Sequence, residues 1–200
     1  MNTSEALITA GRRLFARHGY EGASLRAITR AAKANLGAVT YHFGSKAALY
    51  EAALASLADP FRHHVARVAA SEGPALDRIE RVVDAFFEYL GDHPDMARLL
   101  AQQMASRSAV PAVVRRTLQA NHQVISGLIA QGQKEGTIRK GDPRLMALSI
   151  GSQPVMLTLM RAVFRQAIAI DQSDPTTRSR LVKSVTQFIR AGLASEQEGR

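Results

Sequence analysis

The residues best suited to bind a ligand lie in one short stretch, 35–46, which reads Asn-Leu-Gly-Ala-Val-Thr-Tyr-His-Phe-Gly-Ser-Lys. Asn35 can cap a short helix, because its side-chain oxygen accepts a backbone N–H that the first turn leaves free. Leu36, Val39 and Phe43 then share one face of that helix. The opposite side carries small and hydrogen-bonding residues, namely Gly37, Ala38, Thr40, Tyr41 and His42. A helix with such a front is suited to contact phosphates and the edges of bases.

The stretch ends on residues that suit an anion. Gly44 can end the helix, and Ser45 can cap the next helix, which has Lys46 in its first turn. The helix dipole disfavours a lysine at that place, so a phosphate nearby would explain it.

The chain is basic, and much of its charge lies near the amino terminus. The 200 residues carry a formal net charge of +9, and the sequence pI is about 10.6. Residues 1–46 hold seven Lys or Arg and two Glu. Such a balance favours a polyanionic partner. Charge alone leaves open the alternative of a helical protein that binds nucleic acid or an anionic surface without specificity.

The sequence lacks the motifs of common enzyme, metal and membrane proteins. It has no cysteine, no phosphate-binding glycine loop and no Gly-x-Ser-x-Gly. His63, His64 and His93 lack the spacing of metal ligands. We therefore expect no enzyme activity, no cofactor and no metal. The amino terminus does not read as a signal peptide, and no apolar run approaches the roughly 20 residues that span a bilayer, so we expect a cytoplasmic protein.

The elements that must position the 35–46 stretch are helical. Ser4 is expected to cap a first helix that ends at Gly19, and Ser24 a second helix that leads through the turn at 33–34 into the stretch. Two short helices joined by a tight turn are typical of a helix-turn-helix. The core of this three-helix domain is expected to contain Phe15, Ile28, Val39 and Phe43.

The rest of the chain also shows helical periodicity, and no segment alternates as a strand would. A long helix is expected from Ser45, with a kink or break at Pro60. Asp142 and Asp174, each followed by proline, are expected to open the last two segments, the first of them interrupted at Pro154. The sequence therefore predicts an all-α fold, with an N-terminal helix-turn-helix domain at 1–46 and a C-terminal helical domain for effector binding and dimerisation at 47–200.

Residues 7–50 resemble the DNA-binding domain of the TetR family of bacterial transcriptional regulators. The matching features are Ala10, Leu14-Phe15, Gly19-Tyr20, Ser24, Ile28, Ala31, the run Tyr41-His42-Phe43-Gly44-Ser45-Lys46, and Leu49. Ala34 and Thr40 depart from the family pattern, where a larger aliphatic residue and an aromatic residue are common. The stretch is most similar to a branch that includes regulators of fatty-acid metabolism.

The resemblance implies that the helix at 35–43 enters the major groove of an operator. The expected DNA contacts come from that helix and from the residues that flank it: Ser24, Arg26, Lys33, Asn35, Leu36, Gly37, Ala38, Thr40, Tyr41, His42 and Lys46. Several have plainer interpretations. Tyr41 could pack its ring and expose only its hydroxyl, while Arg26, Lys33, His42 and Lys46 could be ordinary solvated side chains.

The resemblance also implies a homodimer, because two helix-turn-helix units must meet two half-sites of a palindromic operator. The last two helices are expected to form the interface through Leu157, Val163, Phe164, Leu181, Val185 and Phe188, unless these residues are buried within one monomer. A small hydrophobic effector, which would release a repressor from DNA, is expected among Phe86, Tyr89, Leu90, Met104, His122, Ile125, Gln153, Met156 and Met160. The same residues at helical spacing also suit a plain core.

Overall fold

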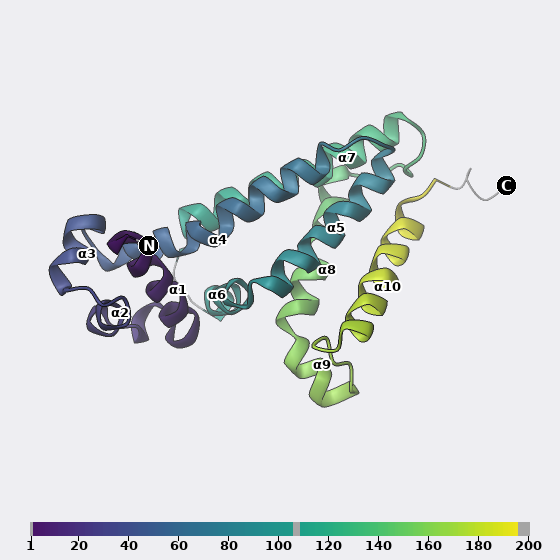
Figure 1. Cartoon of the computed structure of the whole chain (residues 1–200). Helices are drawn as coiled ribbons and strands as arrows, with labels where there is room; N and C mark the ends of the chain where they lie inside the picture. Colours follow the sequence, from purple (N-terminus) through teal and green to yellow (C-terminus); the bar gives the residue numbers. More distant parts are fainter. Residues whose placement is uncertain (1, 106–108, 196–200) are drawn as a thin grey trace. The chain divides into compact units, whose positions relative to one another are not determined.

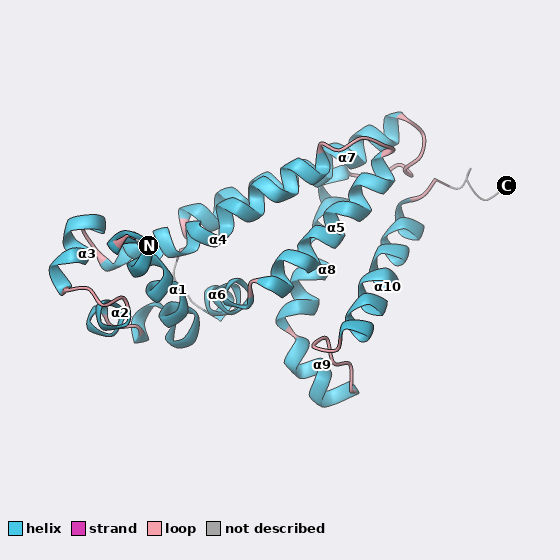
Figure 2. Ribbon diagram, viewed as in Figure 1, coloured by secondary structure: helices cyan, strands magenta, loops and turns pink. Residues whose placement is uncertain are grey.

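The computed structural model describes residues 2–105 and 109–195, and within these ranges it consists of helices and loops (Figures 1 and 2). The helices are α1 (Thr3–Gly22), α2 (Leu25–Ala31), α3 (Leu36–Phe43), α4 (Lys46–Ala69), α5 (Ala75–Asp92), α6 (Pro94–Ala105), α7 (Ala112–Lys134), α8 (Pro143–Leu159), α9 (Arg161–Ile168) and α10 (Pro175–Leu193). The only β-type pairing in the described ranges is one isolated bridge between Ile138 and Ala194. The predicted all-α fold is confirmed.

The helices form two compact units. The first unit contains the described residues up to Phe61 and those from His93 to Thr117; the second contains Arg62–Asp92 and the described residues from Leu118 onward. The chain thus passes between the units three times. The first passage lies within α4, the second between α5 and α6, and the third within α7. A domain boundary at residue 46 stays a prediction.

The start of α1 differs from the prediction. Asn2, not Ser4, caps the helix: its side chain accepts the N–H of Glu5 at 2.9 Å, and the Glu5 carboxylate accepts the N–H of Asn2 at 3.0 Å. This reciprocal capping box satisfies two backbone donors, which a cap at Ser4 would not do. The end of α1 agrees in part, because Gly19 has φ 72° and interrupts the helical geometry, but helical turns continue to Gly22.

Both internal prolines are accommodated within helices. The break predicted at Pro60 is absent, since α4 runs through it, and Leu57 and Phe61 on either side are buried. Pro154 likewise lies buried inside α8. A proline costs the helix one hydrogen bond and a steric clash, and burial of its neighbours offsets that cost here. The predicted interruption occurs instead at Met160, where α8 and α9 are bent by 67°.

Each unit has its own core. In the first, Leu7, Phe15, Ile28, Val39 and Leu49 are buried, whereas Phe43 is only half-buried. In the second, α5 packs against both α8 and α10 (Figure 1). Arg190 of α10 reinforces that contact through ion pairs with Asp77 and with Glu80, the latter at 2.7 Å.

No single helix in the described ranges is long and apolar enough to cross a membrane, although α8 and α9 together would pass such a test by length and composition despite their bend.

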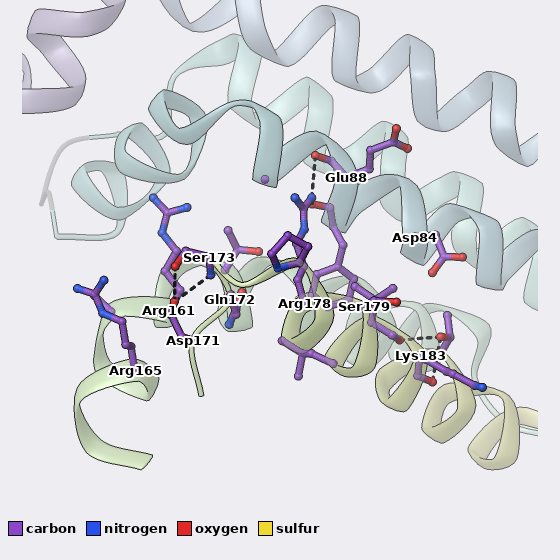
Figure 3. A pocket seen from close by; sticks show the side chains of 18 residues that line it. Asp84, Glu88, Arg161, Arg165, Asp171, Gln172, Ser173, Arg178, Ser179 and Lys183 are labelled. Carbon is purple, nitrogen blue, oxygen red and sulfur yellow. Dashed lines mark hydrogen bonds between the residues drawn. The ribbon is translucent and has the colours of Figure 1, made fainter. Parts of the chain in front are cut away.

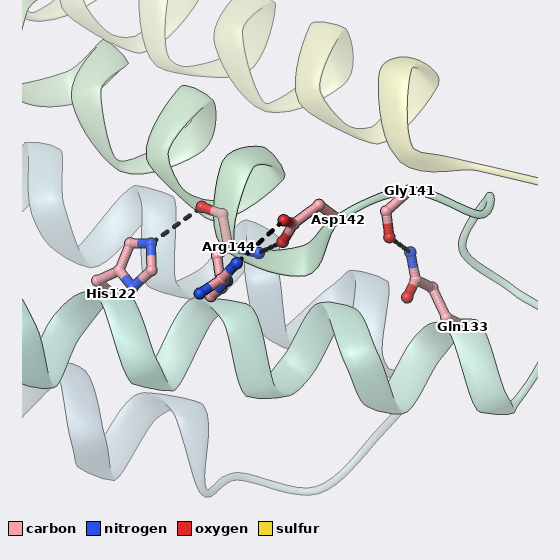
Figure 4. A network of polar contacts seen from close by, with 5 residues as sticks. All are labelled: His122, Gln133, Gly141, Asp142 and Arg144. Atoms are coloured by element: carbon pink, nitrogen blue, oxygen red, sulfur yellow. Dashed lines mark hydrogen bonds and ion pairs between the residues drawn. The ribbon is translucent and has the colours of Figure 1, made fainter.

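Helices α8 and α10 begin where the sequence predicts, and an aspartate caps each of them. Asp142 accepts the N–H of Arg144 at 2.8 Å (Figure 4), and Asp174 accepts that of Thr177 at 2.7 Å. Hydrogen bonds from Thr177 lower the pKa of Asp174 below its usual 3.8. A depressed carboxyl pKa stabilises the fold above the unfolded value, and that stabilisation disappears as the pH falls through the folded value.

We therefore expect Asp174→Asn to lower the melting temperature at pH 7, because asparagine keeps the cap but loses the charge at the helix start. The difference from the wild type should shrink as the pH falls below about 3.8, and it should vanish once the pH is below the lowered pKa of Asp174 in the folded chain. Thermal unfolding followed by circular dichroism from pH 7 to pH 2 measures this, with Asp92→Asn at the end of α5 as the control. A difference that is independent of pH would contradict it.

Candidate DNA-binding surface and a charged cavity

Local hydrogen bonds set the geometry of α2 and α3. The Ser24 hydroxyl accepts the N–H of Ala27 at 3.2 Å, and the Asn35 side chain accepts that of Ala38 at 2.8 Å. Between the helices Lys33 adopts a left-handed conformation with φ 53°. Both caps agree with the sequence prediction, and they fix where each short helix begins.

The outer face of α3 is open to solvent. Tyr41 is 85% exposed, and Gly37, Thr40 and His42 are exposed beside it, whereas Val39 on the opposite side is 1% exposed. Leu36 shares a helix face with Val39 and Phe43 in the sequence pattern and is also one of the predicted DNA contacts; it is 48% exposed. Leu36 is the first residue of the helix, so it lies with the exposed front rather than with the core. The buried face of α3 thus depends chiefly on Val39.

The flanking polar residues are also accessible. Ser24, Arg26, Lys33 and Asn35 are exposed, and Ala38 is half-buried. The exposed face of α3 and these residues together offer hydrogen-bond donors, positive charge and a side-chain-free position at Gly37, as a surface that contacts a duplex requires.

Lys46 has partners within the protein. Its amine donates to the carbonyl of Glu21 at 3.3 Å and lies 4.7 Å from the centre of the Tyr20 ring. Tyr20 in turn packs against Phe15 and Tyr50, with ring centres 6.1 and 5.0 Å away. Lys46 therefore joins the start of α4 to the end of α1, and its predicted phosphate contact stays a prediction.

A cavity of about 1110 Å³ lies in the second unit, among α5, α8, α9 and α10 (Figure 3). Charged side chains line much of it: Arg161, Arg165, Arg178, Lys183, Asp84, Glu88 and Asp171. Its apolar wall includes Phe87, Leu181 and Val182. This volume can hold a ligand of drug size or larger.

Internal contacts fix part of this lining. The Arg178 guanidinium donates to the carbonyl of Phe87 at 3.0 Å and to that of Glu88 at 3.5 Å. Hydrogen bonds from Ser173 hold the pKa of Asp171 below its usual value. Burial, followed by repulsion from Glu88, raises the pKa of Asp84.

Comparison with known proteins agrees with this architecture. A model of bacterial regulatory proteins of the tetR family matches residues 7–53, and a model of the tetracyclin repressor-like C-terminal domain matches residues 76–189. The second match alone covers more than half of the chain. The chain belongs to the TetR family. The resemblance found in the sequence is thereby confirmed, and members of this TetR family are transcriptional regulators, not enzymes.

Curated TetR-family relatives match in the DNA-binding region. The HTH-type transcriptional repressor AcnR of Corynebacterium efficiens is 40% identical over 50 residues, which are 25% of this chain and 27% of that protein. AcnR of Corynebacterium glutamicum is 41% identical over 49 residues, or 24% and 26% of the two chains. The match thus spans about a quarter of these relatives.

Solved TetR-type structures share the fold over most of the chain. FadR from Bacillus subtilis, in complex with stearoyl-CoA, has a TM-score of 0.79 and 17% identity, covering 94% of this chain and 98% of that one. AibR, in complex with isovaleryl coenzyme A and operator DNA, has a TM-score of 0.68 and 18% identity, covering 78% and 86%. At such identities the likeness shows the fold alone.

The nine residues predicted to bind an effector in this TetR-family chain do not line the cavity. Phe86, Leu90 and Ile125 are buried, and Tyr89, His122, Gln153 and Met160 are half-buried. Met156 and Met104 are exposed, and Met104 belongs to the first unit. His122 hydrogen-bonds to the carbonyl of Arg144 at 2.9 Å (Figure 4). An effector site at these nine residues stays a prediction.

The charged cavity was missed because its residues come from four helices and one loop, between positions 84 and 186. Arginines at 161, 165 and 178 follow no motif along the chain. The sequence signal that remains is a cluster of basic residues on an otherwise amphipathic α9, which alone does not indicate a site.

The residues predicted to form the TetR-type dimer interface differ in exposure. Val163 and Phe188 are 52% and 71% exposed. Leu157, Phe164 and Leu181 are half-buried, and Val185 is buried. The exposed apolar side chains are available to a second copy of the chain, and the interface stays a prediction.

The turn between α3 and α4 yields a test of how the DNA-binding surface is held. Gly44 has φ 76°, in the left-handed region, so Gly44→Ala should cost about 1–2 kcal/mol of unfolding free energy even though the added methyl meets no atom. Gly127→Ala is the matched control, because Gly127 lies inside α7 with open space around it and alanine there should be neutral or slightly stabilising. Chemical denaturation measures both, and equal effects would refute the argument.

Proposed function

We propose that the chain is a repressor that binds a palindromic operator as a homodimer and is released by a small, largely hydrophobic effector. The observation that carries this proposal is the exposure of Tyr41, Thr40 and Gly37 on α3 above a buried Val39. Exposed hydrogen-bonding groups on a short helix of a helix-turn-helix are suited to read base edges in the major groove.

Positive charge around α3 supports affinity for a duplex. Arg26 and Lys33 are exposed near the turn between α2 and α3, where they can contact phosphates. Each phosphate that the protein neutralises should steepen the fall of log affinity with log salt concentration by about 0.9. Phosphate contacts position the helix, and the side chains of α3 supply the sequence preference.

A homodimer supports operator recognition because each copy presents one α3 to one half-site. The exposed apolar residues of α9 and α10, including Val163 and Phe188, are the proposed contact surface between copies. Burial of such side chains against an identical surface gives a closed two-fold assembly.

The proposed mechanism is a shift in population between a state that fits the operator and one that does not. An effector in the second unit would bind one state better and so change operator affinity by the same factor. The helices α4 and α7 run continuously through both units, which supports coupling between them. The structural neighbours FadR and AibR were solved with stearoyl-CoA and isovaleryl coenzyme A, which supports an effector that carries an acyl chain.

Selection from a pool of random duplexes tests the function as a whole. A palindromic consensus is expected, with specific affinity about a thousandfold or more above that for unrelated duplex. Equal affinity for every duplex would instead support the second candidate, a nonspecific binder that uses only its charge.

Tyr41→Ala should weaken binding to the selected operator at least about tenfold, because it removes a base or phosphate contact. Stability should hardly change, since the side chain is 85% exposed. Tyr41→Phe separates the hydroxyl from the ring, and affinity for an unrelated duplex serves as the control. Fluorescence anisotropy with labelled duplex measures the affinity of the wild type and both variants for the operator and for the unrelated duplex. Unchanged operator affinity in Tyr41→Ala would contradict the proposal that α3 contacts DNA through its exposed face.

Phe188→Asp should convert the dimer to a monomer, because it places a charge in the proposed apolar contact. The monomer should stay folded, since Phe188 is 71% exposed. Leu118→Asp, on α7, is the matched control, an exposed apolar residue outside the proposed interface. Analytical ultracentrifugation gives the mass of each variant. A Phe188→Asp protein that is still dimeric would place the interface elsewhere.

A further inference from the structure

The cavity of the second unit has a basic end. Arg161 and Arg165 lie at one end together with Asp171, whose pKa is lowered by hydrogen bonds from Ser173 and also by the charge of Arg165. Asp84 and Lys183 lie at the other end (Figure 3). Both arginines come from α9, one turn apart, so their guanidinium groups belong to one helix face.

The charges in the cavity are not equally satisfied. Asp171 accepts two hydrogen bonds from Ser173, from the backbone N–H at 2.9 Å and from the hydroxyl at 2.7 Å. Arg178 donates to two backbone carbonyls. Arg161 is half-buried, and its side chain makes neither a hydrogen bond nor an ion pair in the part of the chain that the structure describes. A guanidinium stays charged at any ordinary pH, so its five donors remain available to an anion.

Apolar surface adjoins these charges. Phe87, Leu181 and Val182 line the same cavity, and they would contact the hydrocarbon part of a ligand. A hollow with an apolar wall and a few convergent polar groups is the usual form of a small-molecule site.

We infer that this cavity binds an amphipathic organic anion, whose phosphate or carboxylate group pairs with Arg161 and Arg165 while its apolar part packs against Phe87, Leu181 and Val182. Both head groups present two oxygens to the planar donors of a guanidinium. The inference names the class of effector, and in that respect it rests on the proposed function; binding itself can be measured without DNA.

Isothermal titration calorimetry of the full chain tests the inference with hexyl phosphate, hexanoate, hexanol and inorganic phosphate. Hexyl phosphate or hexanoate should bind at one site per chain, and the stronger of the two identifies the head group. Hexanol and inorganic phosphate should bind at least about tenfold more weakly, because each lacks one half of the ligand.

Arg161→Gln and Arg165→Gln should each weaken binding of the preferred anion about tenfold, because each removes a charge-assisted hydrogen bond. Arg180→Gln is the matched control, an exposed arginine of α10 outside the cavity lining, and it should leave the affinity unchanged. Circular dichroism checks that the variants fold. No binding to the wild type, equal binding of hexanol, or equal affinity in Arg161→Gln and the wild type would overturn the inference.

Operator binding in the presence of the preferred anion separates this inference from the proposed function. Calorimetric binding that weakens operator affinity supports both. Binding without any change in operator affinity rejects the effector role. A chain that binds the anion and prefers no DNA sequence refutes the proposed function and leaves the cavity assignment standing.

Discussion

The packing of α3 against α1 and α2 is the constraint on which the DNA-binding surface depends. An eight-residue helix has too few hydrogen bonds to persist alone, so its stability comes from the tertiary contacts of Val39 and from the cap at Asn35. Burial of Val39 fixes the rotation of α3 about its axis. Because neighbouring positions on a helix point about 100° apart, that rotation turns Thr40 and Tyr41 outward. The burial of Val39 therefore determines which residues of α3 are exposed.

The second unit obeys a different constraint, the cost of removing charge from water. Arg190 meets that cost through its ion pairs with Asp77 and Glu80 across α5 and α10. Arg178 meets it through backbone carbonyls of α5. The side chain of Arg161 has no such partner within the described part of the chain, and it lies at the basic end of the cavity with Arg165. Arg190 and Arg178 therefore stabilise the fold, whereas the guanidinium of Arg161 is available to bind a ligand.

Features set by neighbouring residues could be predicted from the sequence, and features set by distant ones could not. The caps at Ser24 and Asn35 were foreseen because each hydrogen bond joins residues three positions apart. The cap of α1 was misplaced because a reciprocal bond with Glu5 favours Asn2 over Ser4. The break that was one alternative predicted at Pro60, and the interruption predicted at Pro154, were wrong because burial from elsewhere in the chain outweighs a local penalty. The residues of the charged cavity come from five segments that are distant in sequence, so no local sequence pattern could predict that they line one cavity.

Coupling between effector binding and operator binding requires only a small difference in effector-binding free energy between the two states of the chain. A tenfold change in operator affinity requires about 1.4 kcal/mol of difference in effector binding between the two states. A hydrogen bond to a charged group contributes about 1.5–3 kcal/mol. One contact between an anion and Arg161 or Arg165 that forms in only one state would therefore suffice. Since α8 and α9 meet at a bend at Met160, a small rotation there would move both arginines together, so that anion binding and the orientation of α9 change as one.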